Sequence, residues 1–185
     1  MITYDQLRQI MPHAPPDLVH FVVPLNIAMD ESNISSKPRQ AAFLANLAHE
    51  SGSFRYMEEI ADGSAYEGRR DLGNHEAEAI AVALANGTTP GRFYKGHGPI
   101  QITGYYNHRD CGLALELDLI HSPRLITLPT DGCRSAAWFW RSRGCNELAD
   151  SGRFEAIVRR VNGGLNGLAD GMAYLDRATR VLTNE

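Results

Sequence analysis

Two carboxylates stand on either side of a glycine-containing turn in the first third of the chain. Glu50 ends an apolar segment, and Glu58 and Glu59 follow eight and nine residues later. The negative end of a helix dipole and partial burial would both raise the pKa of Glu50, so that it keeps a proton near neutral pH. A proton donor facing a second carboxylate across a groove is the pair that glycosidases use.

Other interpretations of these carboxylates stay open on spacing alone. The position of Glu50 also suits a solvated glutamate at a helix end, with no catalytic role. Glu67 is a third candidate, although the neighbouring Arg69 and Arg70 favour a structural ion pair for it. Carboxylates are common on protein surfaces, so the pattern needs support from other segments.

The sequence predicts no metal site and no cofactor. His49 precedes a glutamate, as in zinc proteases, but the second histidine required four residues later is replaced by Ser53. His97 and His108 do not form a recognisable ligand pair. The cysteines are odd in number and contain no Cys-x-x-Cys pair, which favours buried thiols over disulfides or zinc ligands. They are Cys111, Cys133 and Cys145.

Length and composition predict one globular domain over residues 1–185. The chain is 43% hydrophobic and 22% charged, which is ordinary for a globular protein. Its net charge of −4 argues against non-specific nucleic-acid binding. No apolar run approaches the roughly 20 residues that span a bilayer, and no secretion signal is visible at the start.

In most segments the hydrophobic residues recur at the spacing of an α-helix, which predicts a mainly helical chain. Thr3 and Gln6 form a capping-box pattern ended by Pro12, and Ser36 with Pro38 begins another helix. The helices expected after the first cover residues 16–29 with a kink at Pro24, 36–52, 76–85 capped by Asn74, 133–143 capped by Asp131, 154–161 and 170–182.

Residues 98–104 are the most strand-like piece. In an extended segment Ile100 and Ile102 would point one way, and Gln101 and Thr103 the other. Aromatic residues cluster in the irregular middle of the chain, where they would stack on sugars or fold onto the core. They are Tyr56, Tyr66, Phe93, Tyr94, Tyr105 and Tyr106.

Taken together, five segments in order resemble family 19 glycoside hydrolases: the chitinases and especially the lysozyme-like phage and prophage endolysins. The segments are AHESGSF (48–54), Glu59 nine residues after Glu50, GHGPIQITGYYNH (96–108), SAAWFWRSRGCNELAD (135–150) and VNGGLNGLAD (161–170). The resemblance covers about residues 36–182. It implies a mainly α, bilobed, lysozyme-like or chitinase-like domain with a cleft and at most a short β element, preceded by a helical cap over residues 1–35.

The resemblance also implies roles for individual residues. It makes Glu50 the general acid and Glu59 the base of an inverting mechanism, with Thr103 holding the attacking water. The remaining residues assigned to the substrate are Gln101, Asn107, Tyr106 and Asn162.

Several positions depart from the family pattern. The stretch after Glu59 lacks the usual asparagines, which keeps Glu67 as an alternative base. His97 and Gly171 stand where relatives usually have arginine. A cleft cation is therefore either missing or supplied from elsewhere, with Arg159 and Arg160 as the candidates.

The function expected from the resemblance is hydrolysis of the β-1,4 bonds of bacterial peptidoglycan by an endolysin. The alternatives are a chitinase and, in another class, a non-catalytic helical module that binds glycan or protein. As an endolysin it would be a monomer made in the host bacterial cytoplasm that acts on peptidoglycan strands after release by a separate pore-forming protein. Neither nucleic-acid binding nor stable membrane insertion is expected.

Overall fold

The computed structural model describes residues 1–183. Its helices, in order, are α1 (Tyr4–Ile10), η1 (Pro16–Phe21), α2 (Val22–Glu31), α3 (Lys37–Glu50), η2 (Ser64–Tyr66), α4 (Ala77–Ala85), α5 (Pro90–Phe93), α6 (Tyr105–Leu115), η3 (Pro123–Thr127), α7 (Pro129–Ser142), α8 (Cys145–Asp150), α9 (Phe154–Asn162) and α10 (Leu168–Thr183), where η marks a 3-10 helix. Pairing of β type among the described residues is limited to two isolated bridges, Glu58 with His97 and His97 with Ile102. The predicted all-α class with at most a short β element is confirmed.

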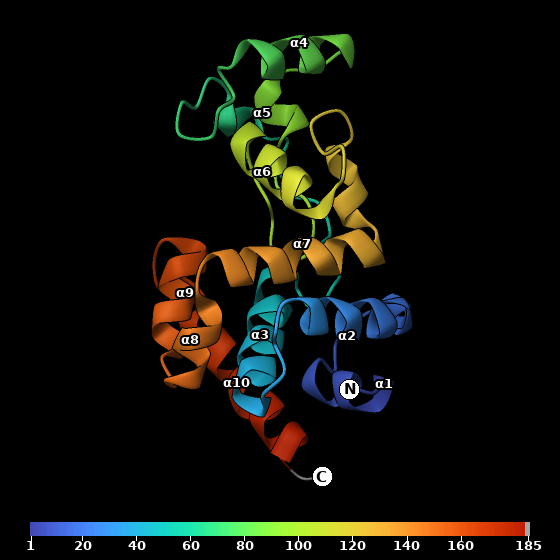
Figure 1. Cartoon of the computed structure of the whole chain (residues 1–185), viewed down its shortest axis with the longest axis vertical. Helices are drawn as coiled ribbons and strands as arrows, with labels where there is room; N and C mark the ends of the chain where they lie inside the picture. The colour runs from blue at the N-terminus through green and yellow to red at the C-terminus, as the bar shows by residue number, and fades with distance from the viewer. Residues whose placement is uncertain (184–185) are drawn as a thin grey trace.

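The molecule is elongated and has two parts (Figure 1). Helices α4, α5 and α6 form the upper part, α1, α2, α3, α8, α9 and α10 form the lower part, and α7 crosses between them. The main core lies in the lower part, where α3 packs along α10 and α2 along α7. A smaller cluster around Ala79, Tyr94 and Tyr105 holds the upper part together.

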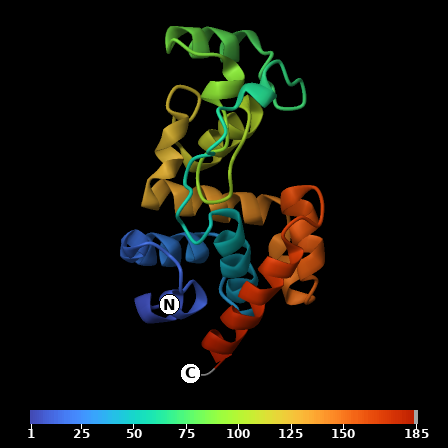
Figure 2. The same cartoon turned by 180° about the vertical axis from the view of Figure 1, so that it is seen from behind.

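Two segments far apart in sequence connect these parts side by side. Figure 2 shows the chain after α3, in teal, and the chain before α6, in yellow-green, running next to each other. They are joined by backbone hydrogen bonds from Glu59 to Gly96 (2.8 Å) and from Gly98 to Met57 (2.8 Å). These two segments carry most of the residues that the sequence assigns to the site.

Several helix boundaries follow directly from local sequence. The predicted capping box of Thr3 and Gln6 begins α1. Ser36 caps α3 by accepting a hydrogen bond from the Arg39 backbone N–H at 3.4 Å. Helix α9 ends at Gly163, whose φ of +70° is costly for other residues. These predictions are confirmed.

The predicted kinked helix over residues 16–29 is wrong. The segment divides into η1 and α2 at Val22, so that Pro24 lies in the first turn of α2. A proline there lacks only an N–H that the helix would leave unpaired, and no kink is needed. The expected apolar stripe is nevertheless buried, with Leu18, Leu25 and Met29 all in the core.

Two predicted helix caps are also wrong. Asn74 is buried and tethers loops instead, because its amide donates to the Tyr66 carbonyl (2.8 Å) and accepts from the Tyr105 N–H (3.0 Å). Helix α7 begins at Pro129, which places Asp131 within its first turn rather than before it.

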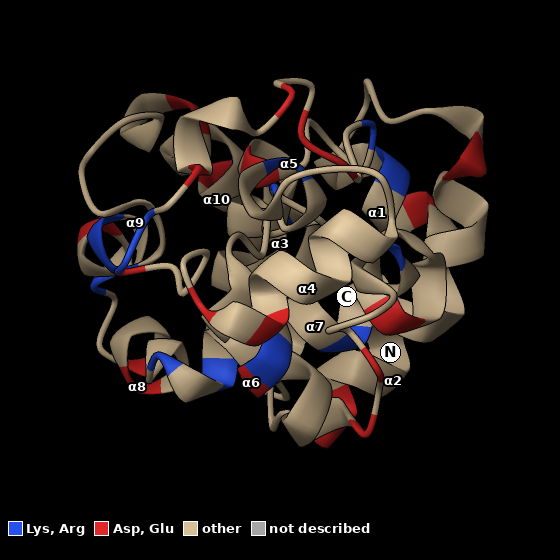
Figure 3. Cartoon of the chain, turned by 90° about the horizontal axis from the view of Figure 1, so that it is seen from above, with Lys and Arg blue, Asp and Glu red and all other residues tan. Residues whose placement is uncertain are grey.

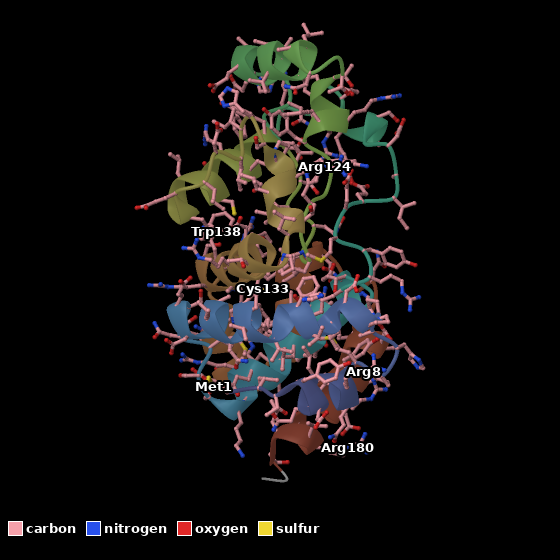
Figure 4. All side chains as sticks on the ribbon, turned by 90° about the vertical axis from the view of Figure 1, so that its right-hand side faces the viewer. Met1, Arg8, Arg124, Cys133, Trp138 and Arg180 are labelled. Atoms are coloured by element: carbon pink, nitrogen blue, oxygen red, sulfur yellow. The ribbon has the colours of Figure 1, made fainter. Side chains whose placement is uncertain are left out.

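The cysteines are buried, as the sequence predicts, and charged residues of both signs are spread over the molecule (Figure 3). All three cysteines are buried free thiols, and burial raises the pKa of Cys111 to about 12. Cys133 lies on α7 between the two parts (Figure 4). Acidic and basic residues are interspersed in the view from above (Figure 3). Over residues 1–183, none of the helices combines the length and apolar character needed to cross a bilayer.

Candidate active site

Glu50 is the last residue of α3, and its carboxyl group is half-buried. Burial raises the pKa of Glu50 above its ordinary value, while His49 and a hydrogen bond from the Asn162 side chain act in the opposite direction. Its Oε1 is buried and has no hydrogen-bond partner among the described residues. An unpartnered buried oxygen suits a neutral carboxyl better than a charged one. The predicted proton-holding environment is therefore present.

A left-handed turn follows Glu50 and fixes the end of α3. Gly52, Ser53 and Phe54 have φ values of +56°, +62° and +64°. The Ser51 hydroxyl stabilises this turn by accepting from the Phe54 N–H (2.7 Å) and donating to the Leu47 carbonyl (2.6 Å). Non-glycine residues in this region are strained and often lie at functional sites.

The loop that precedes α10 packs against the C-terminal end of α3. His49 Nδ1 lies 2.7 Å from Asp170 Oδ2, which ties α3 to α10. Gly167 packs directly on the His49 ring, because a Cβ added there would lie 1.9 Å from Nε2. Asn162 also donates to the Asn166 carbonyl (3.2 Å). Asn162, which the resemblance assigns to the substrate, is near enough to Glu50 to lower its pKa, and its role toward substrate stays a prediction.

Glu59 lies on the connecting segment and is held by neutral donors. The Tyr66 hydroxyl donates to its Oε1 (2.9 Å), and the Gly96 N–H donates to its Oε2 (2.9 Å). Both oxygens of the Glu59 carboxyl group therefore act as hydrogen-bond acceptors. The adjacent Glu58 differs, since it forms ion pairs with Lys95 (3.0 Å) and Arg124 (2.8 Å).

Residues 98–104 form a tight turn rather than an extended strand. His97 and Ile102 exchange backbone hydrogen bonds of 3.0 and 2.8 Å, and Gln101 has a φ of +56°. The strand prediction is wrong, because Gly98 and Gln101 both have positive φ values (+77° and +56°) and the chain reverses between His97 and Ile102. Ile100 and Ile102 are nevertheless buried as expected, while Gln101 and Thr103 stay partly exposed.

This turn groups three of the predicted site residues. Gln101 lies against Gly96, where an added Cβ would lie 2.5 Å from its Oε1 and 3.2 Å from Oε2 of Glu59. The Thr103 hydroxyl donates to the Gln101 carbonyl (3.0 Å), and Asn107 Nδ2 donates to the Thr103 carbonyl (2.7 Å). Gln101, Thr103 and Asn107 are therefore connected to one another and to the backbone that holds Glu59.

Tyr106 has a different setting. Its ring covers Gly73, its hydroxyl donates to Glu76, and the Arg109 guanidinium lies 5.0 Å from the ring centroid. These contacts anchor the start of α6 to the segment before α4. Its assignment to substrate stays a prediction.

The carboxyl group of Glu67 has different hydrogen-bond partners from that of Glu59. It accepts hydrogen bonds from the Thr89 hydroxyl and from the Gly91 N–H (3.1 Å) at the start of α5. The predicted ion pair with its arginine neighbours is wrong, because Arg69 pairs with Asp71 instead. The partners of Glu67 come from a loop that local sequence does not reveal.

Arg159 and Arg160, the candidates for a cation in the cleft, have partners on other parts of the chain. Arg159 forms an ion pair with Glu155 (3.0 Å), and Arg160 donates to the Arg143 carbonyl (2.7 Å). Within the described residues neither guanidinium is bonded to Glu50 or Glu59, so the expectation of a cleft cation from α9 is not supported by these contacts.

Sequence reasoning missed Tyr66 and Gly96 as partners of Glu59. Burial and the hydrogen bond to Glu59 raise the pKa of Tyr66, which keeps its hydroxyl as a donor. The glycine-flanked position before residues 98–104 is the one local signal, since Gly96 has no room for a side chain. No group of three or more potential metal ligands occurs among residues 1–183.

Comparison with known proteins decides the family. The sequence profile of the family described as chitinase class I, glycoside hydrolase family 19, matches residues 25–159. The chain belongs to glycoside hydrolase family 19. It is therefore a glycosidase by family, as the resemblance of its five segments predicts.

This chain aligns with less than half of one family 19 relative and with nearly the whole of another. It is 38% identical to endochitinase At2g43620 of Arabidopsis thaliana over 130 residues, which is 70% of this chain and 40% of that protein. A glycosyl hydrolase family 19 domain-containing protein of Haemophilus influenzae is 29% identical over 208 aligned positions, covering 100% of this chain and 98% of that protein. The chain thus spans less than half of the plant endochitinase.

Solved structures of family 19 chitinases share the fold. Chitinase C of Streptomyces griseus superposes with a TM-score of 0.78 at 22% identity, covering 98% of this chain and 76% of that one. A bacterial family 19 chitinase superposes with a TM-score of 0.75 at 23% identity, covering 100% and 96%. The all-α, lysozyme-like fold of family 19 is therefore confirmed, while the cleft between its two parts stays a prediction.

Proposed function

We propose that this family 19 glycosidase cleaves β-1,4 bonds of an N-acetylglucosamine-containing glycan with inversion at the anomeric carbon. The observation that carries the proposal is the contrast between two carboxyl groups. Glu50 is half-buried with a raised pKa, whereas both carboxylate oxygens of Glu59 accept hydrogen bonds, one from Tyr66 and one from Gly96. A carboxyl group that keeps its proton suits a general acid, and a carboxyl group whose oxygens both accept suits a base.

The proposed reaction is a single displacement by water. Glu50 donates its proton to the oxygen of the leaving sugar, and Glu59 takes a proton from a water molecule. The oxygen of that water forms a bond to the anomeric carbon as the bond to the leaving oxygen breaks. Thr103 already donates to the Gln101 carbonyl, so its oxygen is available to accept a hydrogen bond from the water.

The residues around the turn are the proposed binding groups. Gln101, Asn107 and Asn162 carry amides, which can pair with the N-acetyl and hydroxyl groups of a sugar. Tyr106 offers an aromatic face beside them in sequence. We assign these four to substrate binding, with Glu67 kept as the alternative base.

Chitin is the substrate that the relatives support best. The relatives from Arabidopsis thaliana and Streptomyces griseus carry the names endochitinase and chitinase, whereas the Haemophilus influenzae protein is named only for its family 19 domain. Peptidoglycan is the second candidate, because the five segments resemble the lysozyme-like endolysins of the family. As an endolysin the chain would be a monomer that acts on the wall after a separate pore-forming protein releases it from the host cytoplasm.

Two assays run in parallel distinguish a chitinase from a peptidoglycan hydrolase. The protein is tested on soluble chitin and on Gram-negative cells with a permeabilised outer membrane, whose turbidity falls on lysis. Glu50→Gln removes the transferable proton and is expected to lower the productive rate by roughly 10²–10⁴-fold. Glu155→Gln, at an exposed carboxylate on α9, is the matched control and is expected to keep its rate.

The outcomes are distinct. Turnover of chitin alone supports the chitinase, and lysis alone supports the endolysin. A folded Glu50→Gln protein that works at the normal rate contradicts the mechanism. A folded protein inactive on both substrates would support the non-catalytic binding module.

A further inference from the structure

A pair of histidines lies behind the Glu59 segment in the interior of the upper part. His97 is 2% exposed and His108 is 0% exposed. His97 Nδ1 lies 3.1 Å from His108 Nε2, and His108 Nδ1 lies 2.8 Å from the Gly104 carbonyl oxygen. The mechanism proposed above uses neither ring.

These contacts fix which nitrogens carry protons. A carbonyl oxygen can only accept, so His108 Nδ1 must donate to Gly104 and carries the hydrogen. In a neutral ring the other nitrogen, Nε2, is then an acceptor. His97 Nδ1 must therefore donate to it. With both rings neutral, the two contacts are satisfied together when each ring carries its hydrogen on Nδ1, in a relay directed from His97 through His108 to the Gly104 carbonyl.

The relay connects α6 to the turn that carries the site. His97 pairs through its backbone with Ile102 on one side and with Glu58 on the other. Its neighbour Gly96 donates to the Glu59 carboxylate (2.9 Å). At the far end of the relay, Gly104 follows Thr103 directly. A displacement of either ring would move the donors and acceptors that surround Glu59.

We propose that His97 and His108 are positioning residues, whose neutral Nδ1–H relay holds the 96–104 turn against Glu59. The inference rests on the proposed role of Glu59 as the base.

The surroundings keep both rings neutral. Burial lowers the pKa of His97 to about 4, the charges of Lys95 and Arg124 act in the same direction, and a hydrogen bond to the Lys95 backbone acts in the opposite direction. Burial and the proximity of His97 lower the pKa of His108 to about 3. The other groups facing the pair are Glu58, which is ion-paired to Lys95 and Arg124, and Tyr94, whose ring centroid is 5.5 Å from that of His108. Arg124 is labelled in Figure 4.

Nitrogen NMR of the histidine rings tests the relay without reference to activity. The full chain, labelled with 15N, is measured at pH 6 with long-range proton–nitrogen correlation. We expect both rings to be neutral and protonated at Nδ1. An imidazolium, or an Nε2–H form at either position, would overturn the proposal.

A matched set of variants tests the positioning role. His97→Leu removes the donor to His108, whereas His97→Asn keeps an N–H donor close to the position of Nδ1. We expect His97→Leu to lower kcat by roughly 10²-fold, the size of effect that a small misplacement of catalytic groups produces, with little change in KM. His97→Asn should recover most of this loss. His121→Gln, at an exposed histidine, is the control.

The outcomes separate this inference from the proposed function. Normal kcat in a folded His97→Leu protein, or equal loss in His97→Asn, would contradict the positioning role. If His97→Leu does not fold, the ring protonation measured on the natural chain decides. Full activity of Glu59→Gln would instead refute the proposed base, and the NMR result would still report on the relay.

Discussion

The Asn162 side chain at the end of α9 reaches the half-buried carboxyl of Glu50 at the end of α3, although the two residues are far apart in sequence. Burial raises the pKa of Glu50, and the hydrogen bond from Asn162 moderates that rise. The contact therefore lowers the pKa of Glu50 against the larger effect of burial.

Replacing Asn162 should extend activity to higher pH. Asn162→Ala removes a hydrogen bond that favours the ionised form of Glu50, so the pKa of Glu50 rises further. A general acid works only while protonated, and the alkaline limb of kcat against pH should therefore move upward. Asn166→Ala, in the same loop, is the control. An alkaline limb that stays in place or moves down would contradict the assignment.

Glu50 should reduce stability as the pH rises. Its pKa is higher in the folded than in the unfolded chain, so the folded state binds more protons between the two values. Stability contributed by the neutral group is present at low pH and is lost as the pH rises through the folded pKa. The Tm of Glu50→Gln relative to the natural chain should therefore increase from acid to neutral pH. A difference that is constant or decreases would argue against the buried acid.

Glu59 and Glu67 should respond differently to the same substitution. Glu59→Gln is expected to lose nearly all activity, because the base can no longer accept a proton, and Thr103→Ala should be clearly slowed. Glu67→Gln should lose less than either, since its carboxylate is bound to Thr89 and Gly91. Initial rates on the productive substrate measure the order. A Glu67→Gln protein worse than Glu59→Gln would reverse the assignment.

Activity should survive removal of metal ions. The proposed proton transfers involve carboxyl groups alone, so dialysis against EDTA is expected to leave the rate unchanged. Loss of activity that added zinc restores would revive a metal-dependent amidase or protease.

Helix boundaries that depend on neighbouring residues could be predicted from the sequence. Elements whose packing partners lie far away in the chain could not. Ser36 and Pro38 place the start of α3 correctly, because a cap and an N-terminal proline act within one turn. Helix α6 was missed, since its polar sequence shows no clear stripe and its buried residues pack on neighbours from elsewhere. The turn at 98–104 depends on a left-handed Gln101, which no local rule favours.

The candidate site was predictable in its residue types more than in its contacts. A raised pKa for Glu50 follows from an apolar helix end, and the structure agrees. The resemblance selects Glu59 over Glu58, and the ion pairs of Glu58 with Lys95 and Arg124, which only the fold brings together, agree with that choice. The buried pairing of His97 with His108 is likewise tertiary, because it requires the turn and α6 to pack together.

The anomer formed first tests the central claim most directly. Water activated by Glu59 attacks the face opposite the leaving group, so cleavage of a β-linked strand with Glu50 as acid yields the α-anomer. Proton NMR recorded during the first minutes of hydrolysis, before mutarotation, distinguishes the two forms. The α-anomer appearing first is the predicted result, and the β-anomer appearing first would contradict the inverting mechanism.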